Sequence, residues 1–143
     1  MKKGLSILIL CGGTVACSSD KQESVAVNRQ TKKDVVEVLY FHGAQRCATC
    51  MAIEKNTKEL LEAAYAEPLK SGKVVFRSVD ITKEEALAER YEVSWSSLIF
   101  VDYDKSGNES AANLTEFAFG NARTAPDKFK EGLSERITEM LNN

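Results

Sequence analysis

The hydrophobic residues fall into short runs that predict strands and helices in alternation. Residues 35–41, "VVEVLYF", form a nearly continuous apolar run, which suits a buried central strand. Residues 51–69 place apolar side chains at helical spacing, and Pro68 and Gly72 mark the end of this segment. A second β-rich run covers residues 73–81. The chain is therefore predicted to form a strand, one long helix and a second strand.

Two further helices are predicted from their starting residues. Thr82 and Glu85 stand three positions apart in "TKEE", the spacing of a capping box, and Leu87 and Tyr91 would stack on the helix that follows. Pro126 is suited to the first turn of a last helix. The apolar stripe of that helix consists of Phe129, Leu133, Ile137 and either Met140 or Leu141.

A hairpin is predicted between these two helices. Residues 97–103, "SLIFVDY", and 114–119, "LTEFAF", are interpreted as two strands, and the turn-rich residues 104–113 connect them. The predicted order is β-α-β-α-β-β-α. This order predicts an α/β fold.

Length and charge limit the kinds of protein that the chain can be. With 143 residues, 43% of them hydrophobic, it can bury one core but not two comfortable ones. Its formal net charge is -2, and acidic and basic residues are interspersed. A nucleic-acid partner is not expected, because no basic patch is present to bind phosphates.

The first sixteen residues differ from the rest. Lys2 and Lys3 precede an apolar run from Leu5 to Leu10, which is too short to span a bilayer, and small residues follow. This pattern is typical of a secretory signal peptide at residues 1–16.

The end of this segment, "TVAC", resembles the lipobox of bacterial lipoproteins, although Thr14 stands where that motif prefers Leu. The resemblance implies that Cys17 is acylated and becomes the first residue. Secretion without a lipid and a retained anchor remain as alternatives. Polar residues 17–34 would form a flexible tether before a domain at 35–143. We expect an exported protein of the bacterial cell envelope, on the periplasmic side, which contacts the membrane through its lipid anchor only.

Export changes what the four cysteines can do. Cys11 lies in the removed peptide, and an acylated Cys17 cannot form a disulfide. Cys47 and Cys50 then remain as the free pair in an oxidising compartment, and a disulfide between them is predicted.

The surroundings of this pair, "YFHGAQRCATC", carry a resemblance to a known family. The C-x-x-C follows the first core strand, a long helix lies behind it, and "VDITKEEALAERYEV" and the closing hairpin and helix complete the pattern. Over roughly residues 34–142 the chain resembles the thioredoxin superfamily, and in particular small exported members of it. The resemblance implies a central mixed sheet of about four strands flanked by helices.

The resemblance also assigns roles to the two cysteines. Cys47 would be the nucleophile at the N-terminus of the helix, where backbone N–H groups and the cation of Arg46 favour a thiolate. Cys50, one turn further, would be the resolving thiol that releases the substrate from a mixed disulfide. This chemistry requires no cofactor.

The chain departs from the family pattern in its first strand. The family places a buried Asp there as proton acceptor for the resolving cysteine, whereas this chain has Tyr40 or Phe41. Glu54 or His42 could take over through water. The alternative is that Glu54 is a solvated helix residue and His42 a locally bonded residue at the end of the strand.

A second departure lies in "VSWSSLIF". Ser96 occupies the slot of the family's cis-proline, and Ser97 that of the usual Thr. A cis bond before a residue other than proline costs about 3 to 4 kcal/mol, so the bond before Ser96 is predicted to be trans. Trp95 would either cover the disulfide or grip a substrate there, or be buried in the core.

Three functions follow from these observations. The first is a thiol-disulfide oxidoreductase, reductase or oxidase, that acts outside the cytoplasm on protein or small-molecule thiols with an unidentified redox partner. The second is a metal-binding or metal-delivery module that uses Cys47, Cys50 and His42, although the second ligand pair of a closed zinc site is missing. The third is a non-catalytic binding lipoprotein in which the disulfide is only a staple.

Overall fold

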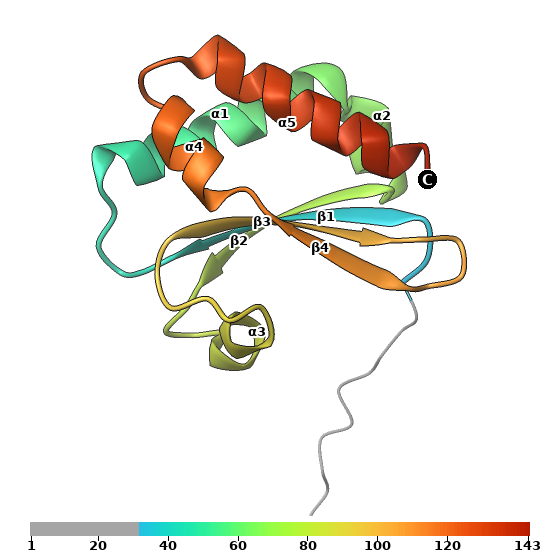
Figure 1. Ribbon diagram of the computed structural model, residues 1–143, viewed down its shortest axis with the longest axis horizontal. Coiled ribbons are helices and arrows are strands. Elements are labelled where there is room, and N and C mark those ends of the chain that lie inside the picture. Colours follow the sequence, from blue (N-terminus) through green and yellow to red (C-terminus); the bar gives the residue numbers. More distant parts are fainter. Residues whose placement is uncertain (1–31) are drawn as a thin grey trace, which may run out of the picture.

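Four strands form one mixed sheet in the computed structural model, which describes residues 32–143. The strands are β1 (Val35–His42), β2 (Val74–Asp80), β3 (Ser97–Tyr103) and β4 (Glu109–Asn113). Their order is β2-β1-β3-β4; β2 runs parallel to β1, whereas β3 is antiparallel to both of its neighbours (Figure 1). The predictions on the signal peptide, Cys17 and the tether up to residue 31 lie outside the described residues.

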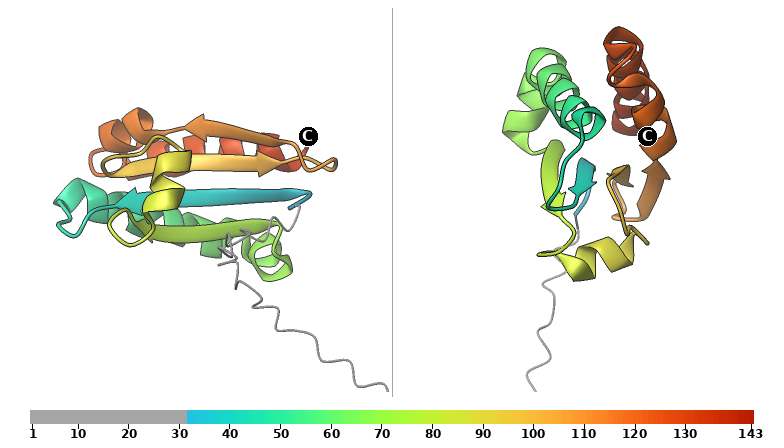
Figure 2. Two further views of the ribbon diagram at one scale, coloured as in Figure 1. Left: turned by 90° about the horizontal axis from the view of Figure 1, so that it is seen from below. Right: turned by 90° about the vertical axis from the view of Figure 1, so that its left-hand side faces the viewer.

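The helices cover the two faces of the sheet unequally. They are α1 (Ala48–Ala64), α2 (Ala66–Ser71), α3 (Glu85–Arg90), α4 (Thr115–Asn121) and α5 (Pro126–Leu141). Among the helices of residues 32–143, α3 alone lies on one face, and the other four lie on the opposite face (Figures 1 and 2). Between residues 32 and 143, no helix has the length and apolar composition needed to cross a membrane.

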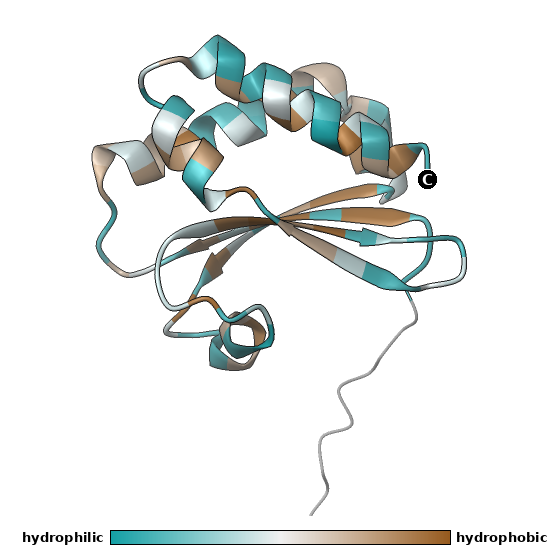
Figure 3. Ribbon diagram, viewed as in Figure 1, coloured by the Kyte–Doolittle hydropathy of each residue, from teal (hydrophilic) through white to brown (hydrophobic). Residues whose placement is uncertain are grey.

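This architecture is a thioredoxin-like fold, as the sequence predicts. The expected order of strands and helices is present, with two additions: the helix after the cysteines is divided into α1 and α2, and α4 is inserted after β4. The inner strands β1 and β3 are largely brown in Figure 3, whereas teal residues are frequent on the helices.

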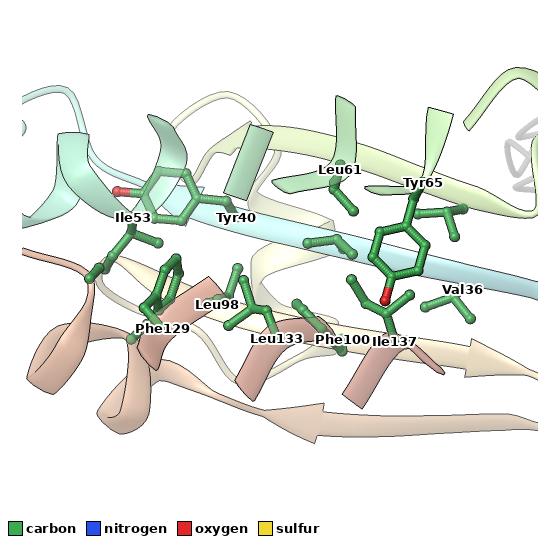
Figure 4. Packing of buried hydrophobic residues seen from close by; sticks show 14 of the residues in the cluster. Val36, Tyr40, Ile53, Leu61, Tyr65, Leu98, Phe100, Phe129, Leu133 and Ile137 are labelled. Carbon is green, nitrogen blue, oxygen red and sulfur yellow. The ribbon is translucent and has the colours of Figure 1, made fainter. Parts of the chain in front are cut away.

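Side chains alternate between the two faces of the central strands and so build two apolar clusters. Tyr40 and Leu98 belong to the larger cluster, beneath α1 and α5 (Figure 4). Phe41 and Ile99 belong to the smaller one, on the side of α3. The stripe predicted for α5 is confirmed, because its buried residues are Phe129, Leu133, Ile137 and Met140.

The prediction of one helix over residues 51–69 is wrong in its details. The helix begins earlier, at Ala48, and is interrupted at Tyr65, whose φ and ψ of -126° and 29° are not helical. The Tyr65 hydroxyl is hydrogen-bonded to Ser134 in α5, at 2.9 Å from its carbonyl oxygen. Pro68 does not end the segment, because proline is tolerated in the first turn of α2. Gly72 ends it, with a left-handed φ of 76°.

The capping box predicted at Thr82 is also wrong. Helix α3 begins at Glu85 after Glu84, and no side chain caps it. Asp80 accounts for the difference, because its carboxylate accepts hydrogen bonds from both the backbone N–H and the hydroxyl of Thr82, at 3.0 and 2.7 Å. This Asx-type turn holds Thr82 outside the helix.

The third correction concerns the second strand of the hairpin. Residues 114–119 form most of α4 rather than a strand, and β4 comes earlier, within the segment predicted as a connection. The backbone of Leu114 still donates to the Leu98 carbonyl, at 2.8 Å, but Thr115 then turns the chain and accepts from the Leu98 N–H at 3.0 Å. The short helix brings Ala118 into the core.

Candidate redox site

Cys47 stands at the junction between β1 and α1. Strand β1 ends at His42, and the loop of residues 43–46 leads to Cys47, which is the N-cap of α1. The Cys47 sulfur accepts a hydrogen bond from the backbone N–H of Cys50, at 3.2 Å. The sulfur thus takes the place of the oxygen that usually caps a helix, and it lies at the positive end of the helix dipole.

The two sulfurs are close, but solvent reaches them unequally. Their Sγ atoms are 2.8 Å apart, and both cysteines are free thiols. Cys47 is exposed, whereas only 5% of Cys50 is exposed. An incoming substrate can therefore reach Cys47 first. The disulfide between the two residues stays a prediction.

Two hydroxyl groups surround Cys50. Its thiol donates to the Ser96 hydroxyl at 3.6 Å, and its backbone carbonyl accepts from the Tyr40 hydroxyl at 2.9 Å. Burial raises the pKa of the Cys50 thiol. The hydrogen bonds of its sulfur with Cys47 and Ser96 act in the opposite direction and outweigh burial, so that the pKa of Cys50 is lowered.

The sequence leaves open whether Tyr40 or Phe41 replaces the buried Asp of the family. In the structure, Tyr40 is the residue on the side of the cysteines. Its side chain is fully buried on the side of the cysteines, whereas Phe41 faces α3. Burial raises the pKa of Tyr40 to about 12, so the hydroxyl remains protonated at neutral pH and serves as a donor. The Arg46 guanidinium lies 5.4 Å from the centre of the Tyr40 ring.

Arg46 and Glu54 form an ion pair beside this ring, and Lys58 lies 2.8 Å from the same carboxylate. Burial alone would raise the pKa of Glu54, but the hydrogen bonds from Lys58 and Arg46 lower it to about 2. Glu54 is therefore a very weak base at neutral pH. The charge of Arg46 is shared with Glu54 and the Tyr40 ring.

His42 lies at the end of β1 and bonds locally. Its Nδ1 is 3.0 Å from the carbonyl oxygen of Gly43, and its ring centre is 5.9 Å from that of Tyr40. Within residues 32–143, no group of three His, Cys, Asp or Glu side chains is arranged to hold a metal ion. The three-ligand set of Cys47, Cys50 and His42 thus has no support in the geometry.

The loop before β3 completes the site. No peptide bond in the described part of the chain is cis, so the bond before Ser96 is trans, as predicted. The Ser97 hydroxyl donates to the carbonyl of Trp95 at 3.0 Å and is buried. Trp95 is 59% exposed, so the alternative of burial in the core is wrong.

Phe119 of α4 lies beside Trp95, a contact that the sequence pattern does not predict. Its ring centre lies 5.5 Å from that of Trp95. Together with Asn113, Thr115 and Glu116, the two rings line an open groove of about 540 Å³. A strand is predicted for residues 114–119, and a strand there does not predict a contact between Phe119 and Trp95.

The similarity of the chain to known proteins is confined to solved structures of low sequence identity. No family model and no curated protein matches the chain. The solved structures that resemble it include three thioredoxins. That of Malassezia sympodialis has 19% identity, covers 78% of this chain and 79% of its own, and has a TM-score of 0.49. Deadhead, the germline-specific thioredoxin of Drosophila melanogaster, has 24% identity, coverage of 71% and 81%, and a TM-score of 0.47. The thioredoxin of Fasciola hepatica has 22% identity, coverage of 76% and 83%, and a TM-score of 0.47.

Proposed function

We propose that this protein is a thiol-disulfide oxidoreductase with Cys47 as nucleophile and Cys50 as resolving thiol. The observation that carries the proposal is the pair itself: an exposed sulfur at the start of a helix, 2.8 Å from a buried one. Only one of the two sulfurs can receive a bulky substrate, and the other is within bonding reach of it after a small movement. This asymmetry separates the two roles that disulfide exchange requires.

The exchange proceeds in two steps, written here in the reducing direction. The Cys47 thiolate attacks one sulfur of the substrate disulfide, the bond between the substrate sulfurs breaks, and the departing sulfur takes a proton from water. Cys50 then loses its proton to solvent and attacks the Cys47 sulfur. The bond between Cys47 and the substrate breaks, and the second substrate sulfur leaves as a thiolate and takes a proton from water. Two electrons have passed to the substrate, and Cys47 and Cys50 are left as a disulfide. A separate thiol donor must reduce this disulfide again, and the reverse sequence describes an oxidase.

Partners and location belong to the same proposal. Substrates are protein or small-molecule thiols and disulfides outside the cytoplasm, and an unidentified redox partner restores the pair. The signal-like residues 1–16 and the lipobox-like cysteine at position 17 support a lipid-anchored protein of the cell envelope. The exposed ring of Trp95 favours protein substrates, because it stands next to Ser96, which contacts Cys50, and offers apolar contact there.

Reduction of a model protein disulfide tests the proposal. The full chain with Cys11→Ser and Cys17→Ser, which retains only the cysteines of the site, should accelerate reduction by dithiothreitol. Cys47→Ser should abolish the acceleration, whereas Cys50→Ser should accumulate a mixed disulfide that mass spectrometry detects.

Two results would contradict the proposal. If the parent chain is no faster than either cysteine variant, the pair is a staple and the protein is a binding lipoprotein. If a stoichiometric metal ion survives dialysis of the reduced chain and is lost in both cysteine variants, the pair belongs to a metal-binding module.

A further inference from the structure

The resolving step poses a problem of proton transfer that the proposed function leaves open. Cys50 is buried and must lose its proton before it can attack the Cys47 sulfur. Glu54 is paired with two cations and its pKa is lowered to about 2, so it is a poor acceptor. The ring of His42 bonds to the adjacent Gly43. Neither of the two acceptors expected from the sequence forms a hydrogen bond with the Cys50 thiol in the described part of the chain.

Two hydroxyl groups lie near Cys50, but only one of them reaches solvent. Tyr40 is fully buried and donates its own proton to the Cys50 carbonyl, so a proton passed to it would have no way out. Ser96 is only partly buried, and its hydroxyl accepts from the Cys50 thiol at 3.6 Å. Ser97, the next residue, is buried and its hydroxyl is bonded to the Trp95 carbonyl instead.

On the basis of the proposed function, we propose that Ser96 is a catalytic residue that relays the proton of Cys50 to solvent. As the Cys50 S–H bond breaks, the proton moves to the Ser96 oxygen, and Ser96 releases its own hydroxyl proton to water. The Cys50 thiolate forms a bond with the Cys47 sulfur, and the substrate sulfur leaves Cys47 and takes a proton from water. Ser96 ends the step as a neutral hydroxyl, so that protons and electrons balance.

A hydroxyl suits this position better than a stronger base. Its oxygen accepts one hydrogen bond and donates another, so a proton can pass through it without a charged intermediate that persists. The same hydrogen bond lowers the pKa of Cys50. Loss of the Ser96 hydroxyl should therefore affect both the rate of the resolving step and its dependence on pH.

Stopped-flow reaction with an aromatic disulfide that releases a coloured thiolate, 5,5′-dithiobis(2-nitrobenzoate), separates the two steps. The full chain with Cys11→Ser and Cys17→Ser should release one coloured thiolate as Cys47 reacts and a second as Cys50 resolves the mixed disulfide. Ser96→Ala should slow the second phase about tenfold at neutral pH and move its pH midpoint upward, with the first phase unchanged. Ser96→Thr, which retains a hydroxyl, should restore the second phase.

Ser94→Ala is the matched control, because it removes an exposed hydroxyl from the same loop and should change neither phase. The proposal is overturned if the second phase of Ser96→Ala keeps the parent rate and pH midpoint, or if Ser96→Thr is as slow as Ser96→Ala. A parent chain without any second phase would refute the proposed function itself. Failure of the relay alone leaves a normal second phase in both the parent and Ser96→Ala.

Discussion

Replacement of Tyr40 by Phe tests how the strand beneath the cysteines influences them. The change removes one oxygen atom and leaves the buried ring in place, so no cavity of consequence forms. The lost interaction is the hydrogen bond of 2.9 Å to the Cys50 carbonyl. The hydroxyl also helps to lower the pKa of the Cys50 thiol, and Tyr40→Phe should therefore raise that pKa.

The effect on stability should be small, because the Cys50 carbonyl lies inside α1 and keeps its helical partner. One lost hydrogen bond with no orphaned acceptor corresponds to about 1 kcal/mol of unfolding free energy. For a domain of this size, this loss lowers the thermal midpoint by roughly 4 °C. The redox chemistry should change in addition, with the pH midpoint of the resolving step displaced upward.

Tyr65→Phe provides the comparison. Tyr65 is also buried, and its hydroxyl bonds to Ser134 and to Thr138, at 3.0 Å from the latter, away from the cysteines. Thermal unfolding and the pH dependence of the second coloured phase should be measured for both variants. Tyr65→Phe should lose at least as much stability as Tyr40→Phe, because its hydroxyl has more partners, but only Tyr40→Phe should displace the pH midpoint. If the two variants give the same pH midpoint, the hydroxyl of Tyr40 has no influence on Cys50 and the reasoning fails.

Three further predictions concern accessibility, charge and packing. Iodoacetamide at mildly acidic pH should alkylate the exposed Cys47 before its buried partner, and equal labelling in peptide mass maps would contradict this order. Glu54→Gln should lower the unfolding free energy at neutral pH but not near pH 2. The pKa of this carboxyl is 4.5 in the unfolded chain and about 2 in the folded one. The stabilisation by the Glu54 carboxylate is therefore lost as the pH falls from 4.5 to about 2. Denaturant titrations at both pH values check it, and Glu62→Gln on the exposed face of α1 should show no such dependence. Gly132→Ala should lower the thermal midpoint, since the new Cβ would lie 2.5 Å from the ring of Phe117 and this overlap outweighs the gain of about 1 kcal/mol in helix propensity. With Phe117→Ala already present, the same change should raise the midpoint.

The buried elements could be predicted from the sequence because burial leaves a pattern. Strands β1 and β3 are nearly continuous apolar runs, helix α5 carries an apolar stripe at helical spacing, and the bounds of all three agree closely with the prediction. Strand β4 lacks this signal. Its sequence is "ESAAN", its side chains are mostly exposed, and its backbone pairing with β3 is what holds it in the sheet.

Helix α4 has no clear local signal for a helix. Its apolar residues, at 114 and 117–119, do not alternate as they would in a strand, and the aromatic Phe117 and Phe119 favour a strand by composition although the segment is helical. The carbonyl of Ala122, just beyond α4, accepts a hydrogen bond from the Asn56 side chain of α1, at 2.8 Å. Such a contact across 66 positions leaves no mark in the local pattern.

Some features of the candidate site can be predicted from the sequence and others cannot. The spacing of Cys47 and Cys50, followed by a helical pattern, is enough to predict two neighbouring sulfurs at a helix start. The pairing of Arg46 with Glu54 cannot be predicted from the sequence, because it depends on the direction in which each side chain leaves the backbone. The hydrogen bond between Ser96 and Cys50 cannot be predicted either, because it depends on how closely the loop before β3 approaches the buried sulfur.

The direction of β1 determines how the protein presents its cysteines. The chain comes into the sheet at Val35, and the cysteines lie beyond His42, at the other end of the same strand (Figure 1). Eight residues of extended chain measure about 26 Å, so this distance separates the start of the strand from the loop that leads to Cys47. A large partner that docks at the cysteines therefore contacts the domain at the end of β1 that is opposite to its start at Val35.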